Sequence, residues 1–170
     1  MNTERKQVAK WLRFYILILV LSGISALPVE KELEFLISQF PSEGSIKGWL
    51  KLVLKGVSQA NQDYPFLFYG YDWLAFAHFM LAILFIGPLL NPVKNKWVIE
   101  FGMISCVLII PFALVAGQIR GIPVWWRIID CSFGAIGFIP LLLCLQKINL
   151  IEKKEKQEVQ HKEQFELLVA

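Results

Sequence analysis

The chain has 170 residues, 56% of them apolar, and carries a formal net charge of +3 at pH 7. A soluble domain of this length leaves much of its surface in water and could not bury so much apolar area. The composition therefore excludes an ordinary globular protein and indicates a lipid environment. The charges lie at the two ends and in short connecting segments and form no basic stripe, which excludes a nucleic-acid-binding protein.

Four apolar runs approach or reach the length needed to cross a bilayer core of about 30 Å, which takes roughly 20 helical residues. Tryptophan lies at or near the start of the last three, as is typical of the membrane–water interface. We therefore predict an all-α integral membrane protein, a four-helix bundle that forms a single domain over residues 1–170. The predicted spans are residues 11–27, 73–90, 97–117 and 124–145. Three prolines interrupt these spans and free backbone carbonyls: Pro88, Pro111 and Pro140.

The first run begins among basic residues, which is also the pattern of a signal peptide. Gly23 and Ser25 would form a weak cleavage site, but Ile24 and Leu27 are unfavourable in the neighbouring frames. We expect this run to be retained as a membrane anchor. Cleavage would leave three spans and the same outer surface.

Residues 28–72 form the sizeable insertion between the first two spans. From Ile46 to Val57, apolar residues recur at i, i+3, i+4, i+7, i+8 and i+11, with lysines along another face, which predicts an amphipathic helix. A second apolar stripe runs from Val29 to Phe40 and ends at Pro41. We interpret both as extracytoplasmic helices on the membrane surface, with lysines directed toward lipid phosphates. The alternative is a cap over a site between the spans.

The distribution of lysine and arginine predicts the orientation. With the N-terminus inside, eleven basic residues face the cytoplasm and six face outward, so the positive-inside rule favours both termini in the cytoplasm. In the turn after the second span, Lys96 lies one helical turn before Glu100 and is predicted to pair with it.

The last segment, residues 146–170, is rich in lysine and glutamate. Glu152 and Lys156 are spaced i, i+4, as helical ion pairs are. We predict a solvated helical extension of the fourth span. A helix that binds a protein partner is the alternative.

Two ionisable residues lie at similar depth in the outer half of the predicted membrane. His78 is five residues into the second span, about 7.5 Å, and Asp130 is six residues into the fourth, about 9 Å. Alanines and glycines flank them at helical spacing, which favours close helix approach and side chains directed into the bundle. The predicted polar cluster, open to the outside, comprises His78, Asp130, Arg127, Asp72, Gln118 and Arg120.

Three interpretations of this cluster compete. In the structural one, Asp130 pairs with Arg127 along its own helix and His78 hydrogen-bonds to Asp130. In the second, the cluster binds or relays a proton, a small polar solute or a lipid headgroup, since histidine is the side chain that titrates near neutral pH. In the third, His78 is a general base oriented by Asp130 in a membrane-embedded hydrolase. No serine or cysteine nucleophile motif accompanies it, so we assign no catalytic residue.

Neither a metal nor a cofactor is expected. His78 is the one histidine in the predicted spans, which excludes bis-histidine haem ligation within one chain and makes a metal site unfavourable. The three cysteines lie inside apolar runs and form no C-x-x-C, so they support neither a disulfide framework nor a thiol redox motif.

Three stretches carry a resemblance to known proteins: Tyr69 to Phe79, Asn91 to Cys106 and Arg120 to Gly134. They resemble a group of small, uncharacterised four-helix proteins of the bacterial inner membrane. The resemblance covers the last three spans. It implies a bacterial inner-membrane setting and gives no activity.

Together these features predict a polytopic membrane protein that is non-enzymatic and works by assembly or interaction. Its expected partners are the lipid bilayer and a protein partner or second copies of itself, with no nucleic acid. The alternative is binding or transport of a solute, proton or lipid headgroup at the polar cluster, and a membrane-embedded hydrolase comes after that.

Overall fold

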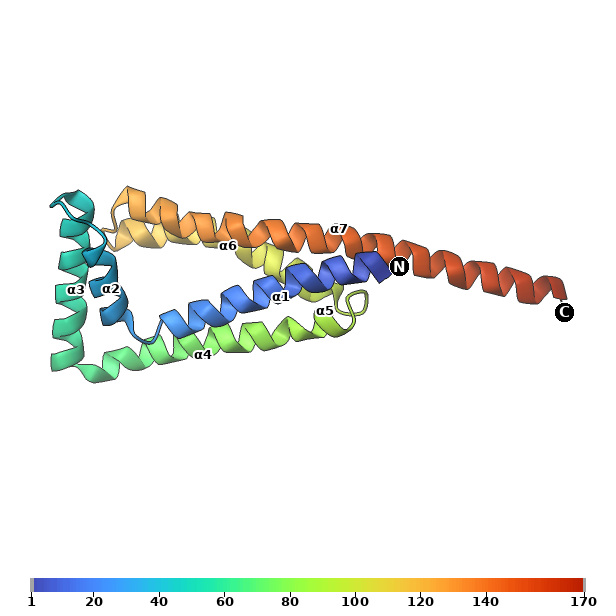
Figure 1. Ribbon diagram of the computed structural model, residues 1–170, viewed down its shortest axis with the longest axis horizontal. Helices are drawn as coiled ribbons and strands as arrows, with labels where there is room; N and C mark the ends of the chain where they lie inside the picture. The colour runs from blue at the N-terminus through green and yellow to red at the C-terminus, as the bar shows by residue number, and fades with distance from the viewer. Residues whose placement is uncertain (1, 170) are drawn as a thin grey trace. The chain divides into compact units, whose positions relative to one another are not determined.

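The computed structural model describes residues 2–169 and is 88% helical, with no strand among those residues (Figure 1). Four helical segments are long and apolar enough to cross a membrane: Thr3–Ser25, Pro65–Leu90, Lys96–Ile119 and Val124–Leu168. The all-α class and the four membrane-spanning candidates predicted from the sequence are thereby confirmed.

Helices and short connections account for nearly all of the described chain. In order, the elements are α1 (Asn2–Ser25), α2 (Val29–Ser38), α3 (Ser45–Asp63), the 3₁₀ helix η1 (Pro65–Phe68), α4 (Tyr69–Leu84), α5 (Ile86–Leu90), α6 (Lys96–Ile119) and α7 (Val124–Val169). The second spanning segment begins earlier than predicted, because η1 and the aromatic first turn of α4 precede Trp73.

Proline explains one break and leaves two helices intact. Pro88 has no N–H for the Leu84 carbonyl and its ring crowds that carbonyl, so α4 ends at Leu84 and α5 begins at Ile86. Pro111 and Pro140 instead lie inside α6 and α7, which both continue through them. Each of these two removes one N–H from its helix, but neither ends the helix.

The chain packs as two compact units, and each is described by itself. The first unit comprises Met1–Ile16 and Ile83–Ala170, and the second comprises Leu17–Ala82. The boundaries fall within α1 and near the end of α4.

The core of the first unit lies where the first half of α1 meets α5, α6 and the middle of α7. Its side chains are at most 2% exposed, and they are Val8, Leu12, Phe85, Val98, Ile99, Leu141, Cys144, Ile148 and Ile151. The thiol of Cys144 donates a hydrogen bond to the Val8 carbonyl at 3.8 Å, which joins α7 to α1. The predicted first span is therefore an integral part of this core.

A tight turn folds α7 back along α6. Gly121 adopts φ +69°, a left-handed conformation that favours glycine. The Ile122 N–H donates to the Gly117 carbonyl at 2.8 Å and the Gly121 N–H donates to the Gln118 carbonyl at 3.1 Å. This pattern is the Schellman motif, which ends a helix and reverses the chain, and Pro123 follows it.

Ion pairs join α7 to α1 and α6 beyond the apolar part of α7. The Arg5 guanidinium lies 2.6 Å from a Glu155 carboxylate oxygen, and Lys154 lies 2.6 Å from Glu4. They tie the start of α1 to α7 at two neighbouring positions.

Lys96, at the start of α6, pairs with Glu152 on α7 at 3.2 Å. The predicted partner, Glu100, was therefore wrong. The Glu152–Lys156 pair is confirmed, with a separation of 2.8 Å. Hydrogen bonds from Lys156 and Lys96 hold the pKa of Glu152 below its usual range.

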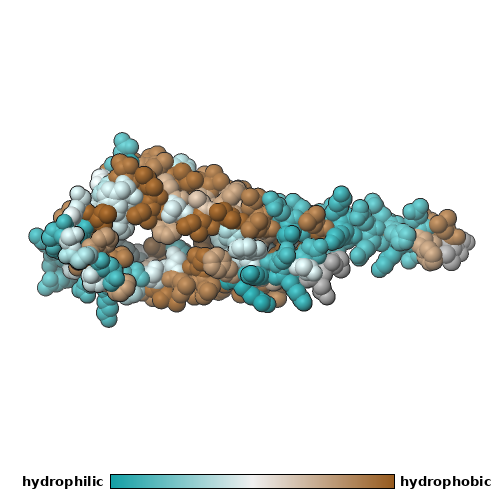
Figure 2. Space-filling view, turned by 45° about the horizontal axis from the view of Figure 1, so that its top comes forward, coloured by the Kyte–Doolittle hydropathy of each residue, from teal (hydrophilic) through white to brown (hydrophobic). Residues whose placement is uncertain are grey.

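The predicted helical tail is present as the continuation of α7. At 1.5 Å per residue a 46-residue helix is about 70 Å long, more than twice the bilayer core, so residues 146–169 extend beyond the part of α7 that is needed to cross it. Figure 2 shows this part covered by hydrophilic residues up to its apolar end, where Leu167 and Leu168 are about 80% exposed.

In the second unit, the end of α1 packs against α4, and α2 and α3 lie across the ends of both (Figure 1). A Cβ atom at Gly23 would lie 3.1 Å from the Ala75 carbonyl oxygen and from the His78 Cβ, so the two helices approach at a glycine. Leu33 of α2 and Leu50 of α3 are buried. The two helices predicted in the insertion are thus present.

Two of the three lysines predicted on α3 are neutralised locally. Lys51 lies 2.6 Å from Glu43 and Lys47 lies 3.4 Å from it. The hydrogen bond from Lys51, with the charge of Lys47 nearby, lowers the pKa of Glu43. Lys55 forms no ion pair with any residue that the structure describes.

Candidate functional site

The residues of the predicted polar cluster fall into two groups. Arg127, Asp130, Gln118 and Arg120 belong to the first unit, on α6, α7 and the turn between them, whereas His78 and Asp72 belong to the second unit, on α4. Each group is described separately, and the contact between His78 and Asp130 stays a prediction.

Arg127 is held by α6. A Cβ atom at Gly117 would lie 2.6 Å from both Cγ and Cδ of Arg127, so the aliphatic part of the arginine fits where a side chain is missing. Its Nη1 donates a hydrogen bond to the Leu114 carbonyl at 3.2 Å, and its buried Nε makes none. Within residues 2–169 no ion pair joins Arg127 to Asp130, so the structural interpretation of the cluster lacks the ion pair on which it depends. The guanidinium is directed instead to a backbone carbonyl of α6.

Asp130 lies on the stripe of α7 that faces α6. Arg127, Gly134 and Gly137 share this stripe at helical spacing, and the two glycines meet Cys106 of α6. A Cβ atom at Gly134 would lie 2.5 Å from the Cys106 carbonyl oxygen. The carboxylate of Asp130 is half-buried and forms no hydrogen bond with the described part of the chain.

The other two members of this group lie at the turn. Gln118 and Arg120 are exposed near the end of α6. The rings of Trp125 and Trp126 contact each other edge to face, with centroids 5.5 Å apart, at the start of α7. Two arginines and two indoles at one end of a spanning hairpin are typical of a membrane interface.

His78 has one ring nitrogen occupied and one available. Its Nδ1 lies 2.8 Å from the Leu74 carbonyl oxygen, which can only accept, so the neutral ring carries its proton on Nδ1. Nε2 then keeps a lone pair that can take a proton or bind a polar group. Asp72 is six residues earlier on α4, about 240° around the helix, and is exposed on a different face.

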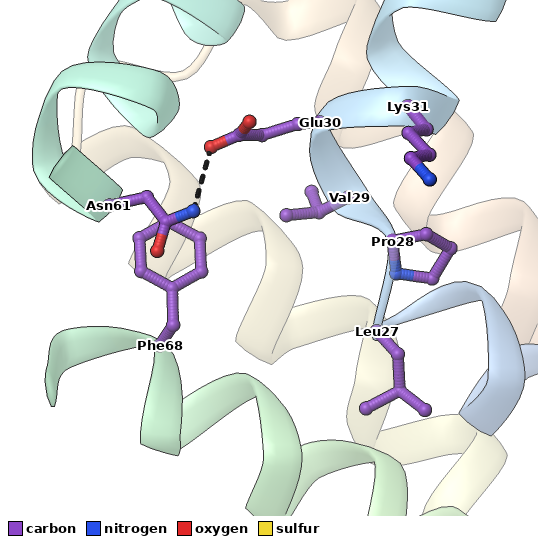
Figure 3. Close-up of a pocket in the computed structure, with 7 residues that line it drawn as sticks. All are labelled: Leu27, Pro28, Val29, Glu30, Lys31, Asn61 and Phe68. Carbon is purple, nitrogen blue, oxygen red and sulfur yellow. Dashed lines mark hydrogen bonds between the residues drawn. The ribbon is translucent and has the colours of Figure 1, made fainter. Parts of the chain in front are cut away.

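A pocket that the sequence did not reveal lies in the second unit, between the start of α2 and the end of α3 (Figure 3). Its volume is about 370 Å³. The Asn61 amide donates a hydrogen bond to the Glu30 carboxylate at 3.1 Å across it. The lining residues are Leu27, Pro28, Val29, Glu30, Lys31, Asn61 and Phe68. Helical periodicity could not find this pocket, because Glu30 and Asn61 are brought together only by the packing of α2 on α3.

Among residues 2–169, no group of three or more histidine, cysteine, aspartate or glutamate side chains is arranged to hold a metal ion. The arrangement offers instead an available imidazole nitrogen, a half-buried carboxylate and a mixed polar and apolar pocket. No protein-family model, curated protein or solved structure matches the chain. The resemblance to bacterial inner-membrane proteins therefore stays a prediction.

Proposed function

We propose that this chain is a non-enzymatic protein of the bacterial inner membrane, with both termini in the cytoplasm, that works by binding a protein partner through the end of α7. The observation that carries the proposal is the exposure of every residue from Gln157 to Leu168. An isolated helix of this length is marginal in water. A partner would stabilise it and cover its apolar side chains, which include Val159, Phe165, Leu167 and Leu168, all more than half exposed.

The contacts of the first unit support the proposed topology. Arg5 pairs with Glu155 and Lys96 pairs with Glu152, so the start of α1, the turn before α6 and the start of the α7 extension lie together. With an even number of spans, the start of α1 and the α7 extension must lie on the same side of the membrane. The excess of basic residues in these segments favours the cytoplasmic side.

The test is the mass of the complex released from native membranes by mild detergent, using an N-terminal tag on the full chain. We expect a discrete species heavier than the monomer, with a partner in fixed stoichiometry. The double variant Phe165→Glu with Leu168→Glu should return the protein to monomer. Gln160→Glu, which adds a charge at an exposed polar position, is the matched control and should leave the complex unchanged.

Two results would refute the proposal. One is a monomer in both wild type and double variant. The other is a homo-oligomer, with no partner, whose mass the double variant does not change.

A second candidate function rests on the geometry of His78: binding or relay of a proton or small polar solute at Nε2. Its test combines His78→Gln and Asp130→Asn. Hydrogen bonds in membranes average about 0.6 kcal/mol in double-mutant cycles, so a structural pair would couple weakly and give a mild phenotype. A functional site instead predicts unchanged stability and a cellular phenotype that depends on external pH near neutrality. Stable variants without any phenotype would exclude it.

A further inference from the structure

The pocket of Figure 3 lies in the second unit, near the end of α1 and the start of α4. Leu27 and Pro28 lie two and three residues after the end of α1 at Ser25, and Phe68 directly precedes α4. These two helices are spanning candidates that pack against each other at Gly23. The pocket is therefore near the ends of both candidate spans, where a bilayer crossed by these helices would have its phospholipid headgroups.

The lining of the pocket is amphipathic and carries both charges. Leu27, Val29 and Phe68 provide an apolar wall, whereas Glu30 and Lys31 place an acid and a base on the first turn of α2, with Glu30 directed toward Asn61 and Lys31 on another side of the helix (Figure 3). The hydrogen bond from Asn61 holds one oxygen of the Glu30 carboxylate in place. The second oxygen of Glu30 and the ammonium of Lys31 have no partner within residues 2–169, so both remain available to a ligand.

We infer that this pocket binds the headgroup of a zwitterionic phospholipid, one with a phosphate diester and a primary ammonium. Lys31 binds the phosphate, Glu30 binds the ammonium, and the apolar wall contacts the glycerol and the first acyl carbons. The volume of about 370 Å³ is near the lower end of small-molecule sites, which suits a headgroup whose acyl chains stay in the bilayer.

The charges exclude simpler occupants. A lipid with only a negative headgroup would leave its phosphate beside the Glu30 carboxylate with no ammonium to offset the repulsion. A soluble cation would use Glu30 but neither Lys31 nor the apolar wall. A zwitterionic lipid uses every part of the lining.

The experiment titrates the full-length protein in detergent micelles with short-chain phosphatidylethanolamine and counts bound lipid by native mass spectrometry. We expect saturable binding of one lipid. Lys31→Gln should weaken it about tenfold, the loss of one charge-assisted contact. Lys55→Gln removes a lysine of α3 that lies outside the pocket and has no ion pair within residues 2–169. It is the matched control and should leave the affinity unchanged.

The relative affinities for different headgroups distinguish a zwitterionic lipid from the other possible ligands. Short-chain phosphatidylglycerol should bind more weakly than phosphatidylethanolamine, and Glu30→Gln should abolish that preference. Equal or tighter binding of phosphatidylglycerol by the wild type would overturn the zwitterionic assignment. Equal binding of glycerophosphoethanolamine, which has no acyl chains, would overturn the lipid assignment.

A second measurement needs no variant. Phosphatidylethanolamine carrying a diazirine near its glycerol should label peptides that contain residues 27–31 or 65–68. Excess unlabelled phosphatidylethanolamine should suppress the labelling. Labelling confined to other parts of the chain would overturn the inference.

Discussion

Glycines in this protein differ in what an added methyl group would meet. At Gly134 a Cβ atom would lie 2.5 Å from a backbone oxygen of α6, which cannot move without displacing the helix. At Gly56 on α3 an added Cβ atom would meet nothing within 4 Å beyond its chain neighbours and the backbone of its own helix. The first glycine is thus required by helix contact, whereas the second only lowers helix propensity.

Gly134→Ala should lower the free energy of unfolding by about 1–3 kcal/mol, as overpacking does. Gly56→Ala should raise it by up to about 1 kcal/mol, because alanine is the better helix former. Unfolding in mixed detergent micelles with increasing dodecyl sulfate, followed by circular dichroism, gives both values. Shifts of the same sign in the two variants would contradict this account of the α6–α7 contact.

Glu152 should make stability depend on pH. Its pKa is lower in the folded state than the ordinary value of 4.5, because Lys156 and Lys96 stabilise the charged form. The pairs therefore stabilise the fold above pH 4.5, and this contribution is lost as pH falls through the folded-state pKa.

The unfolding temperature of Glu152→Gln should be below that of the wild type at pH 7, and the difference should shrink in acid. Glu158→Gln changes an exposed glutamate that has no ion pair within residues 2–169, so its difference from the wild type should be small at every pH. A deficit for Glu152→Gln that persists unchanged in acid would show that charge is not the cause.

For single residues, the sequence predicted which side chains form ion pairs better than it predicted their partners. The spacing of Glu152 and Lys156 predicted a pair that the structure confirms, because both lie on one helix. Lys96 was assigned to Glu100 by the same rule, yet it pairs with Glu152, 56 residues away on another helix. Helical spacing describes neighbours on one helix only, so it cannot show a competing residue brought in by packing.

The helices themselves were largely predictable. Apolar length predicted the four spanning segments, and the 3.6-residue period predicted α2 and α3. The break at Phe85 follows from Pro88. The sequence could not show that Pro88 ends a helix and Pro111 does not, since the neighbours that let a membrane helix tolerate proline are not visible in it.

Among these helices, α1 was open to two interpretations, a retained anchor and a cleaved signal peptide, and its packing favours the first. Leu12 is fully buried and Val8 is 1% exposed in the core of the first unit, so loss of α1 would remove part of that core. We expect the protein isolated from membranes with a C-terminal tag to retain this helix. Intact mass spectrometry checks this, and a mass that corresponds to cleavage after Ser25 would contradict it.

Leu12→Ala tests the same packing within the retained helix. Truncating a buried leucine should cost about 2–5 kcal/mol of stability. Leu17→Ala, on the same helix but 53% exposed, should cost much less. Equal effects in the unfolding assay would mean that α1 is not part of the core.

For the whole molecule, residue counting along a span gives depth but neither the rotation of a helix nor the order of its neighbours. That is why His78 and Asp130 could be assigned similar depths while the contact between them stays a prediction. Rotation became visible only where packing defines it, as at Gly134 against Cys106 and at Gly23 against Ala75. The pocket at Glu30 and Asn61 escaped the sequence for the same reason.

The topology is the prediction that tests the whole molecule. Reporter fusions after Gln62, Lys94, Arg120 and the last residue should read outside, inside, outside and inside. The physical reason is the positive-inside rule, applied to the basic residues at the start of α1 and in the α7 extension, which the Arg5–Glu155 pair joins. The Gln62 fusion reads outside whether or not α1 is cleaved, so it is independent of the processing test. A cytoplasmic signal at Arg120 would place the α6–α7 turn on the inner side and contradict the proposed orientation.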